Sequence, residues 1–157
     1  MHESKIPDGF KLFGKDDSFN DAIAPLYLKV DDKRPCIGLL LEKHHCNYVG
    51  FCHGGVIMTL IDIALSSAVC CELGKYTSTP TVSINFDFIA GAKQGDWIYA
   101  DVQSVNLTRS MGFASAMIIG EKGTVATASG CYKLPADLQS APGMSVEEYH
   151  LWRFSNA

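Results

Sequence analysis

The stretch that decides the fold reads His53-Gly54-Gly55-Val56-Ile57-Met58-Thr59-Leu60-Ile61-Asp62-Ile63-Ala64-Leu65-Ser66-Ser67-Ala68-Val69-Cys70-Cys71. Its length and nearly continuous apolar character predict one long helix over 56–71, stopping at Gly74, which other elements must cover. A single acid, Asp62, lies in the middle. A carboxylate in apolar surroundings is costly unless it is paired or hydrogen-bonded. Asp62 is therefore either a structural acid or a group for proton transfer or attack on a carbonyl.

Strand-like segments lie on both sides of this helix. Before it, 25–30 and 36–42 predict a hairpin with a turn at 31–35. After it, alternating β-branched and aromatic residues predict four further strands, separated by glycine- and serine-containing turns: 81–90, 97–106, 111–119 and 124–134. One apolar helix followed by four such strands predicts an α+β fold, in which a curved antiparallel β-sheet wraps around one long central helix.

The 157 residues, of which 47% are apolar, suit a single domain over 1–157. Its core is expected at about 20–134, with a polar N-terminal arm at 1–19 and a C-terminal tail at 135–157. Within the tail, Ser145 followed three residues later by Glu148 has the spacing of a capping box and predicts a short helix.

Charge and hydropathy exclude several classes of partner. The net charge of −4 and the lack of clustered Lys and Arg argue against nucleic acid. The apolar run 56–71 is short for a membrane span and carries Asp62 at its centre, so no membrane is expected. Residues 1–10 contain no apolar signal-peptide core, which predicts a cytoplasmic protein.

Cysteine chemistry is expected to be structural. In a cytoplasmic chain the six cysteines are reduced, and most fill the core: Cys36, Cys46, Cys52, Cys70, Cys71 and Cys131. Soft donors gather at 44–46 and 52–53, but neither C-x-x-C nor H-E-x-x-H occurs, so no metal and no cofactor are expected. No base is marked for a nucleophilic Cys52. Walker, G-x-G-x-x-G and G-x-S-x-G patterns are absent from the sequence.

A longer pattern runs through the helix and the loop before it: His45, Asn47, Gly50, His53, Gly54, Gly55, Leu60 and Asp62. It resembles the H-x-N-x-x-G-x-x-H-G-G-x-x-x-x-L-x-D signature of hotdog-fold acyl-CoA thioesterases of the phenylacetate-pathway (PaaI-like) family, over roughly residues 20–134. The resemblance implies a hotdog fold and hydrolysis of an acyl-CoA thioester to a free acid and coenzyme A. It also implies homodimers that often pair into homotetramers.

The residue types of the pattern suit thioester hydrolysis. Gly54 and Gly55 at a helix N-terminus can bring backbone amides to an oxyanion, and Asn47 can donate its amide to the carbonyl or place a water. Asp62 can act as general base on that water or as direct nucleophile. His53 can orient Asn47, contact the thioester or cap the helix. By position in the family pattern, Thr81 resembles a Ser/Thr that holds the attacking water.

Helix geometry separates these groups. Asp62 lies eight residues after Gly54, about 12 Å along the axis, whereas an attacking water must lie about 3 Å from the carbonyl carbon. An antiparallel copy of the helix across a two-fold axis would bring the amide end of one subunit to the acid of the other. The sequence therefore predicts active sites shared between subunits.

The sequence marks the residues that contact the substrate less strongly than it marks Asp62 and the helix N-terminus. Arg109 and Ser110 match a region where the family contacts coenzyme A, and Lys93 and Lys122 are further cations for its phosphates. The acyl pocket is expected to be lined by apolar residues near Asp62: Ile61, Leu65, Met58, Phe51 and Tyr48. The main rival function is a catalytically silent acyl-CoA-binding protein. Hydratase or dehydratase activity is disfavoured, because no second acid and histidine pattern accompanies the first.

Overall fold

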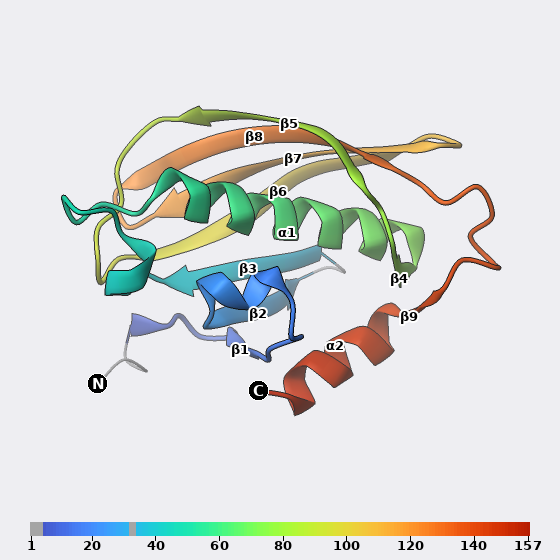
Figure 1. Cartoon of the computed structure of the whole chain (residues 1–157), viewed down its shortest axis with the longest axis horizontal. Helices are drawn as coiled ribbons and strands as arrows, with labels where there is room; N and C mark the ends of the chain where they lie inside the picture. The colour runs from blue at the N-terminus through green and yellow to red at the C-terminus, as the bar shows by residue number, and fades with distance from the viewer. Residues whose placement is uncertain (1–4, 32–33) are drawn as a thin grey trace.

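A curved antiparallel sheet lies over one long helix (Figure 1). The computed structural model describes residues 5–31 and 34–157. Seven strands form the sheet in the order β1-β2-β3-β6-β7-β8-β5. Their bounds are β1 Lys11–Phe13, β2 Leu26–Asp31, β3 Arg34–Leu40, β5 Thr81–Phe88, β6 Trp97–Leu107, β7 Met111–Gly120 and β8 Gly123–Lys133. The predicted α+β fold with a sheet wrapped around a central helix is confirmed.

The central helix α1 spans Gly54–Leu73, two residues longer at each end than the predicted 56–71. It begins after His53, whose Nδ1 accepts a hydrogen bond from the Gly55 N–H at 2.9 Å. It ends at Gly74, which adopts the left-handed conformation (φ 77°) that glycine takes without strain. The predicted stop at Gly74 is thus confirmed.

The sheet covers only one side of α1. Leu60, Ile61 and Leu65 are fully buried, whereas Asp62 is half-buried and Met58 is 42% exposed. The expectation of an acid deep in an apolar interior is therefore wrong for the single chain. A helix lying in the curve of one sheet keeps an open side, and Asp62 lies on it.

Among the described residues, α1 is the helix long and apolar enough to cross a membrane. The expectation that this segment is too short for a span is therefore wrong, because the helix has 20 residues. Its apolar side is nevertheless occupied by the sheet. α1 is thus the buried core helix of the fold.

The strand predictions hold to within a few residues. The hairpin is confirmed as β2 and β3, but Asp31 pairs with Arg34, so both strands extend into the turn predicted at 31–35. The remaining turn residues, Asp32 and Lys33, lie outside the described part of the chain. The four strands after α1 are confirmed as β5, β6, β7 and β8.

The two ends of the chain contain structure that the sequence patterns did not predict. The polar arm includes β1, which pairs with β2, and a short 3-10 helix, η2 (Phe19–Ile23). In the tail, β9 (Gly143–Ser145) pairs with β4 (Lys75–Thr77) just after α1. The predicted tail helix is confirmed as α2 (Val146–Ser155), with the Ser145 and Glu148 capping box formed in both directions.

A buried arginine fastens α2 to the N-terminal arm. Arg153 is 2% exposed, and its Nε donates to the Gly14 carbonyl oxygen at 2.7 Å. Its Nη1 donates to Asp16 Oδ2 at 2.7 Å and to the Tyr149 hydroxyl at 2.8 Å. The guanidinium also lies 3.8 Å above the centre of the Phe13 ring. Because a buried charge needs such partners, this contact fixes the position of α2.

We predict that Arg153→Met lowers the free energy of unfolding by about 3 kcal/mol, because it leaves the largely buried Asp16 carboxylate without its partner. Urea denaturation followed by circular dichroism measures the change. Arg109→Met, at an exposed turn, is the matched control and should stay within about 0.5 kcal/mol of the parent. A loss below about 1 kcal/mol for Arg153→Met would mean that the arginine does not hold the two ends together.

Candidate functional site

Asp62 is held by two hydroxyl groups from the sheet. Its Oδ1 accepts hydrogen bonds from Thr81 Oγ1 at 3.0 Å and from the Tyr132 hydroxyl at 3.2 Å. Among the described residues, no donor lies on Oδ2. Burial, and after it the charge of Asp62, raises the pKa of the Tyr132 hydroxyl well above its ordinary value, so this group keeps its proton and donates. The carboxylate therefore has one oxygen fixed and one oxygen free to react.

A β-bulge brings Thr81 to this position. Thr81 pairs with Tyr132, but Ser83 pairs with Cys131, so Val82 is an extra residue on β5. Side chains alternate along a regular strand, which would put Thr81 and Ser83 on the same face. The bulge turns Thr81 toward α1 while Ser83 stays on the opposite face. The contact between Thr81 and Asp62 thus depends on one inserted residue.

A cavity of about 320 Å³ opens beside Asp62. We call it the Asp62 cavity; it is lined by α1, by the connection from Tyr76 to Thr81, and by Asn20 and Tyr149 from the two ends of the chain. Ile61 and Leu65, expected in the apolar lining, are fully buried and do not line this cavity. The exposed side chains of Met58, Phe51 and Tyr48 do not line this cavity either.

Asn47 is arranged as a donor. Its Oδ1 accepts the backbone N–H groups of Val49 at 3.1 Å and Phe51 at 3.2 Å, which folds the loop before α1 into a compact turn. Because the oxygen is used by the loop, the side-chain NH₂ group remains to donate elsewhere. This agrees with a role in which Asn47 donates to a carbonyl or to a water.

The N-terminus of α1 offers fewer free amides than expected. The Gly55 N–H donates to His53 Nδ1, so the structure assigns His53 the capping contact and occupies one of the two predicted amides. In the described residues no acceptor lies on the Gly54 N–H. A Cβ at Gly55 would lie 3.0 Å from His53 Nδ1, a tight contact that favours glycine at this position. With Nδ1 accepting, a neutral His53 carries its proton on the exposed Nε2.

The other soft side chains of this region are structural. His45 is fully buried between the Glu42 N–H and the Ile23 carbonyl oxygen, and burial lowers its pKa, so the ring is neutral. Burial raises the pKa of the Cys52 thiol to about 12, which makes it a poor nucleophile. Within residues 5–31 and 34–157, no three His, Cys, Asp or Glu side chains form a group able to hold a metal ion.

The structure brings some of the predicted residues together and leaves others apart. Thr81 contacts Asp62, but Gly54 lies about 12 Å from Asp62 along α1, as the helical rise requires. Arg109 and Ser110 form the exposed turn between β6 and β7, at the same end of the sheet as Tyr132, which pairs with Gly112. Lys93 lies at the other end of α1, 5.2 Å from the centre of the Phe51 ring.

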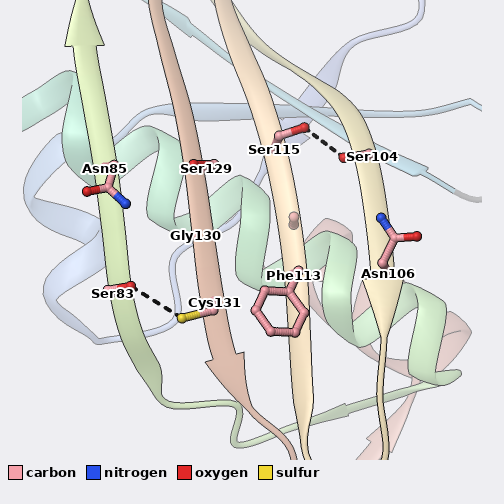
Figure 2. Close-up of a pocket in the computed structure, with 10 residues that line it drawn as sticks. Ser83, Asn85, Ser104, Asn106, Phe113, Ser115, Ser129, Gly130 and Cys131 are labelled. Carbon is pink, nitrogen blue, oxygen red and sulfur yellow. Dashed lines mark hydrogen bonds between the residues drawn. The ribbon is translucent and has the colours of Figure 1, made fainter.

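A second hollow lies on the opposite face of the sheet (Figure 2). It measures about 340 Å³ and is lined mainly by small polar side chains of β5, β6, β7 and β8, including Ser83, Asn85, Ser104, Ser115 and Cys131. Ser104 bonds Ser115 at 2.8 Å, and Ser83 contacts Cys131 at 3.3 Å. Because neighbouring residues of a strand face opposite ways, Cys131 lies here while Tyr132 points to Asp62. None of the predicted site residues lines this hollow.

Sequence and structure comparisons agree with each other. A family model of the thioesterase superfamily matches residues 49–127. The chain is 31% identical over 131 residues to the Pseudomonas aeruginosa protein named "Putative esterase PA0474", covering 83% of this chain and 98% of that protein.

Two solved structures have a similar fold. The phenylacetic acid degradation protein PaaI from Thermus thermophilus, solved as a point mutant, gives a TM-score of 0.66 at 21% identity, covering 76% of this chain and 100% of that one. A hypothetical thioesterase from Streptococcus pneumoniae, solved with coenzyme A, gives a TM-score of 0.64 at 20% identity, covering 80% and 91%. The fold is the hotdog fold, and the chain belongs to the thioesterase superfamily.

Proposed function

We propose that this protein is an acyl-CoA thioesterase that hydrolyses an acyl- or aryl-acyl-CoA to the free acid and coenzyme A. The observation that carries the proposal is the state of Asp62. Thr81 and Tyr132 both bond Oδ1, which orients the carboxylate and leaves Oδ2 available at a cavity. A pure binding protein has no need of a carboxylate held in this way beside a ligand cavity.

In the general-base form of the reaction, Asp62 Oδ2 takes a proton from a water whose oxygen bonds to the thioester carbon. The tetrahedral intermediate then collapses, the C–S bond breaks, and the proton passes to the leaving thiolate of coenzyme A. In the nucleophilic form, Oδ2 bonds to that carbon directly, and the C–S bond breaks to release the coenzyme A thiolate. Water then hydrolyses the resulting anhydride, which releases the acid and restores the Asp62 carboxylate. Both forms use the same free oxygen, Oδ2. We assign Thr81 the role of holding the attacking water beside it.

The carbonyl oxygen needs donors that Asp62 cannot supply. The Asn47 amide and the Gly54 N–H are available, with His53 capping the same helix end through the Gly55 amide. Since Gly54 lies about 12 Å from Asp62 along α1 and Asn47 lies in the loop before Gly54, we assign both to the partner subunit of each site. The proposed assembly is therefore a homodimer with two shared sites, able to pair further into a homotetramer.

The surface of the chain supports such a dimer. β5 is an edge strand of the sheet, and an edge presents unpaired N–H and C=O groups to another chain. Large apolar side chains are exposed on and beside it, among them Val82 (58%), Phe88 (54%) and Ile89 (61%). An exposed apolar area beside an open edge is typical of an association surface.

We also assign residues to the binding of coenzyme A and a cellular compartment to the protein. Arg109 and Ser110 lie at the Asp62 end of the sheet, and we assign them to the coenzyme A moiety. No metal or other cofactor takes part in the proposed steps. A cytoplasmic location agrees with six free cysteines, which a reducing compartment maintains.

We predict thiol release from at least one member of a panel of aryl-acetyl, benzoyl and medium-chain acyl-CoA thioesters, unchanged by EDTA. A thiol-reactive dye measures the released coenzyme A. The panel includes unesterified coenzyme A as the control for dye background. Measurable binding without thiol release from any member would instead identify a silent acyl-CoA-binding protein.

We predict that Asp62→Asn lowers kcat by at least about a hundredfold with little change in KM, because the amide can neither take a proton nor attack. The amide oxygen can still accept from Thr81 and Tyr132, so the thermal midpoint should hold or rise. Ser83→Ala, on the far face of the same sheet, is the control and should keep kcat. Near-parental turnover in a folded Asp62→Asn protein would make Asp62 a structural acid.

The shared site predicts complementation between two inactive variants. Asn47→Asp keeps the oxygen that accepts from Val49 and Phe51 but removes the NH₂ donor, and Asp62→Asn removes the base. After random subunit exchange about half of the dimers are mixed, and each mixed dimer holds one intact site. We expect activity to recover to about a quarter of the parent, measured by thiol release.

Native mass spectrometry of differently tagged subunits confirms that exchange has occurred. The same variants mixed without exchange, under conditions that keep the dimers intact, provide the control. If exchanged dimers stay inactive, each site is built within one chain, and the shared-site part of the proposal is wrong.

A further inference from the structure

The Asp62 cavity runs along α1 away from the acid. Asp62, Ser66 and Cys70 line it and follow each other at intervals of four residues, so they lie on the same side of the helix. Eight residues separate Asp62 from Cys70, which corresponds to about 12 Å along the axis. The cavity therefore has one end at the carboxylate and another end near the C-terminal part of α1.

Three of the hydroxyl and thiol groups along this cavity already have acceptors in the chain. Ser66 Oγ donates to the Asp62 backbone carbonyl at 2.8 Å, and Thr77 Oγ1 donates to the Pro142 carbonyl at 2.7 Å. Cys70 Sγ donates to the Thr77 carbonyl at 3.5 Å. A hydrocarbon chain in this cavity would therefore leave none of these three donors unpaired, which lowers the cost of burying polar groups against it.

Two stacked tyrosines stand at the end away from the acid. Tyr76, in β4, and Tyr149, in α2, lie with ring centres 3.7 Å apart and planes within 13°, and both line the cavity. Figure 1 shows β4, β9 and the start of α2 gathered at the C-terminal end of α1. The stack thus joins the tail of the chain to the element that follows the core helix.

Residues of α2 and of the N-terminal arm fix the position of the two stacked rings. The Tyr149 hydroxyl accepts from the buried Arg153, which also binds Gly14 and Asp16 of the N-terminal arm. The Tyr76 hydroxyl lies 3.4 Å from His150 Nε2. A ring fixed by neighbours on both ends of the chain cannot move aside without breaking buried contacts.

The geometry points to a size limit on the acyl group: the Asp62 cavity receives the acyl chain, and Tyr149, backed by Tyr76, sets its maximum length. This inference rests on the proposed function, because the thioester carbon must lie at Asp62. A volume of about 320 Å³ is at the lower end of the roughly 300–1,000 Å³ range of small-molecule sites. The substrate class is therefore acyl-CoA with an acyl group of limited length, and longer chains meet the tyrosine stack.

The test uses straight-chain acyl-CoA thioesters of increasing length and the full-length protein. For the parent we expect kcat/KM to fall steeply beyond one chain length, since a poorly fitted methylene changes discrimination by about tenfold or more. In Tyr149→Ala we expect that limit to move to longer chains, with at least a tenfold gain for the first chain that the parent rejects. Thr79→Phe, which puts a ring into the cavity, should move the limit to shorter chains.

Two variants serve as matched controls. Tyr149→Phe keeps the ring and loses only the hydroxyl, so its length limit should equal that of the parent. Leu151→Ala removes a side chain that is 70% exposed on the same helix and does not line the cavity, and should also leave the limit unchanged. If Tyr149→Ala does not fold, Thr79→Phe provides the test by itself.

A binding measurement distinguishes a failure of this inference from a failure of the proposed function. Non-hydrolysable thioether analogues of the same lengths, measured by calorimetry, should show the same length limit and the same shift in Tyr149→Ala. A limit in binding without any thiol release would remove the thioesterase assignment and keep the cavity assignment. Turnover whose length limit is the same in the parent, Tyr149→Ala and Thr79→Phe would overturn the inference and leave the thioesterase assignment intact.

Discussion

The packing of α1 against the concave face of the sheet is the constraint on which the other features depend. Burying a leucine or isoleucine side chain contributes about 1.5–3 kcal/mol, so Leu60, Ile61 and Leu65 together decide which side of the helix faces the sheet. With these residues turned inward, Asp62 lies half-buried at the border of the open side. The position of the acid follows from the burial of its neighbours, and its two hydroxyl partners then fix its orientation.

Local signals in the sequence predicted most of the fold. The end of α1 at Gly74 and the start of α2 at Ser145 each depend on residues within one helical turn, and both are confirmed. β1 was missed because three residues, Lys11–Phe13, carry too little alternation to mark a strand. The pairing of β4 with β9 was missed because it joins segments about 70 residues apart, and no local pattern reports such a contact.

The difference between local signals and long-range contacts also applies to the candidate site. Asp62 stands out in the sequence because its neighbours are apolar, whereas Tyr132 lies 70 residues away in an ordinary strand. Its importance depends on the register between β5 and β8, which the sequence alone did not specify. The use of the Gly55 amide by His53 was likewise one of several open interpretations, since a histidine before two glycines can serve as cap or as catalyst. Side-chain direction, more than residue type, separates these interpretations.

The N-terminal arm and the C-terminal tail lie outside the signature region but help to form the Asp62 cavity. Asn20 and Tyr149 line the cavity that begins at Asp62, and Arg153 joins the segments that carry them. The arm and the tail therefore belong to the same packed unit as α1. Substitutions in them can change the space beside the acid while the signature residues stay the same.

The bulge in β5 has a consequence for how such proteins diverge. Because Val82 has no partner on β8, regular pairing continued from Ser83 toward the start of the strand would place Val82, and no longer Thr81, opposite Tyr132. The threonine would then point to the outer face, and the carboxylate would lose one of its two donors. Loss of the bulge would thus remove a contact of the acid while preserving the sheet, the core and the recognisable signature. The register of this strand at Thr81, as much as residue identity, sets the surroundings of Asp62.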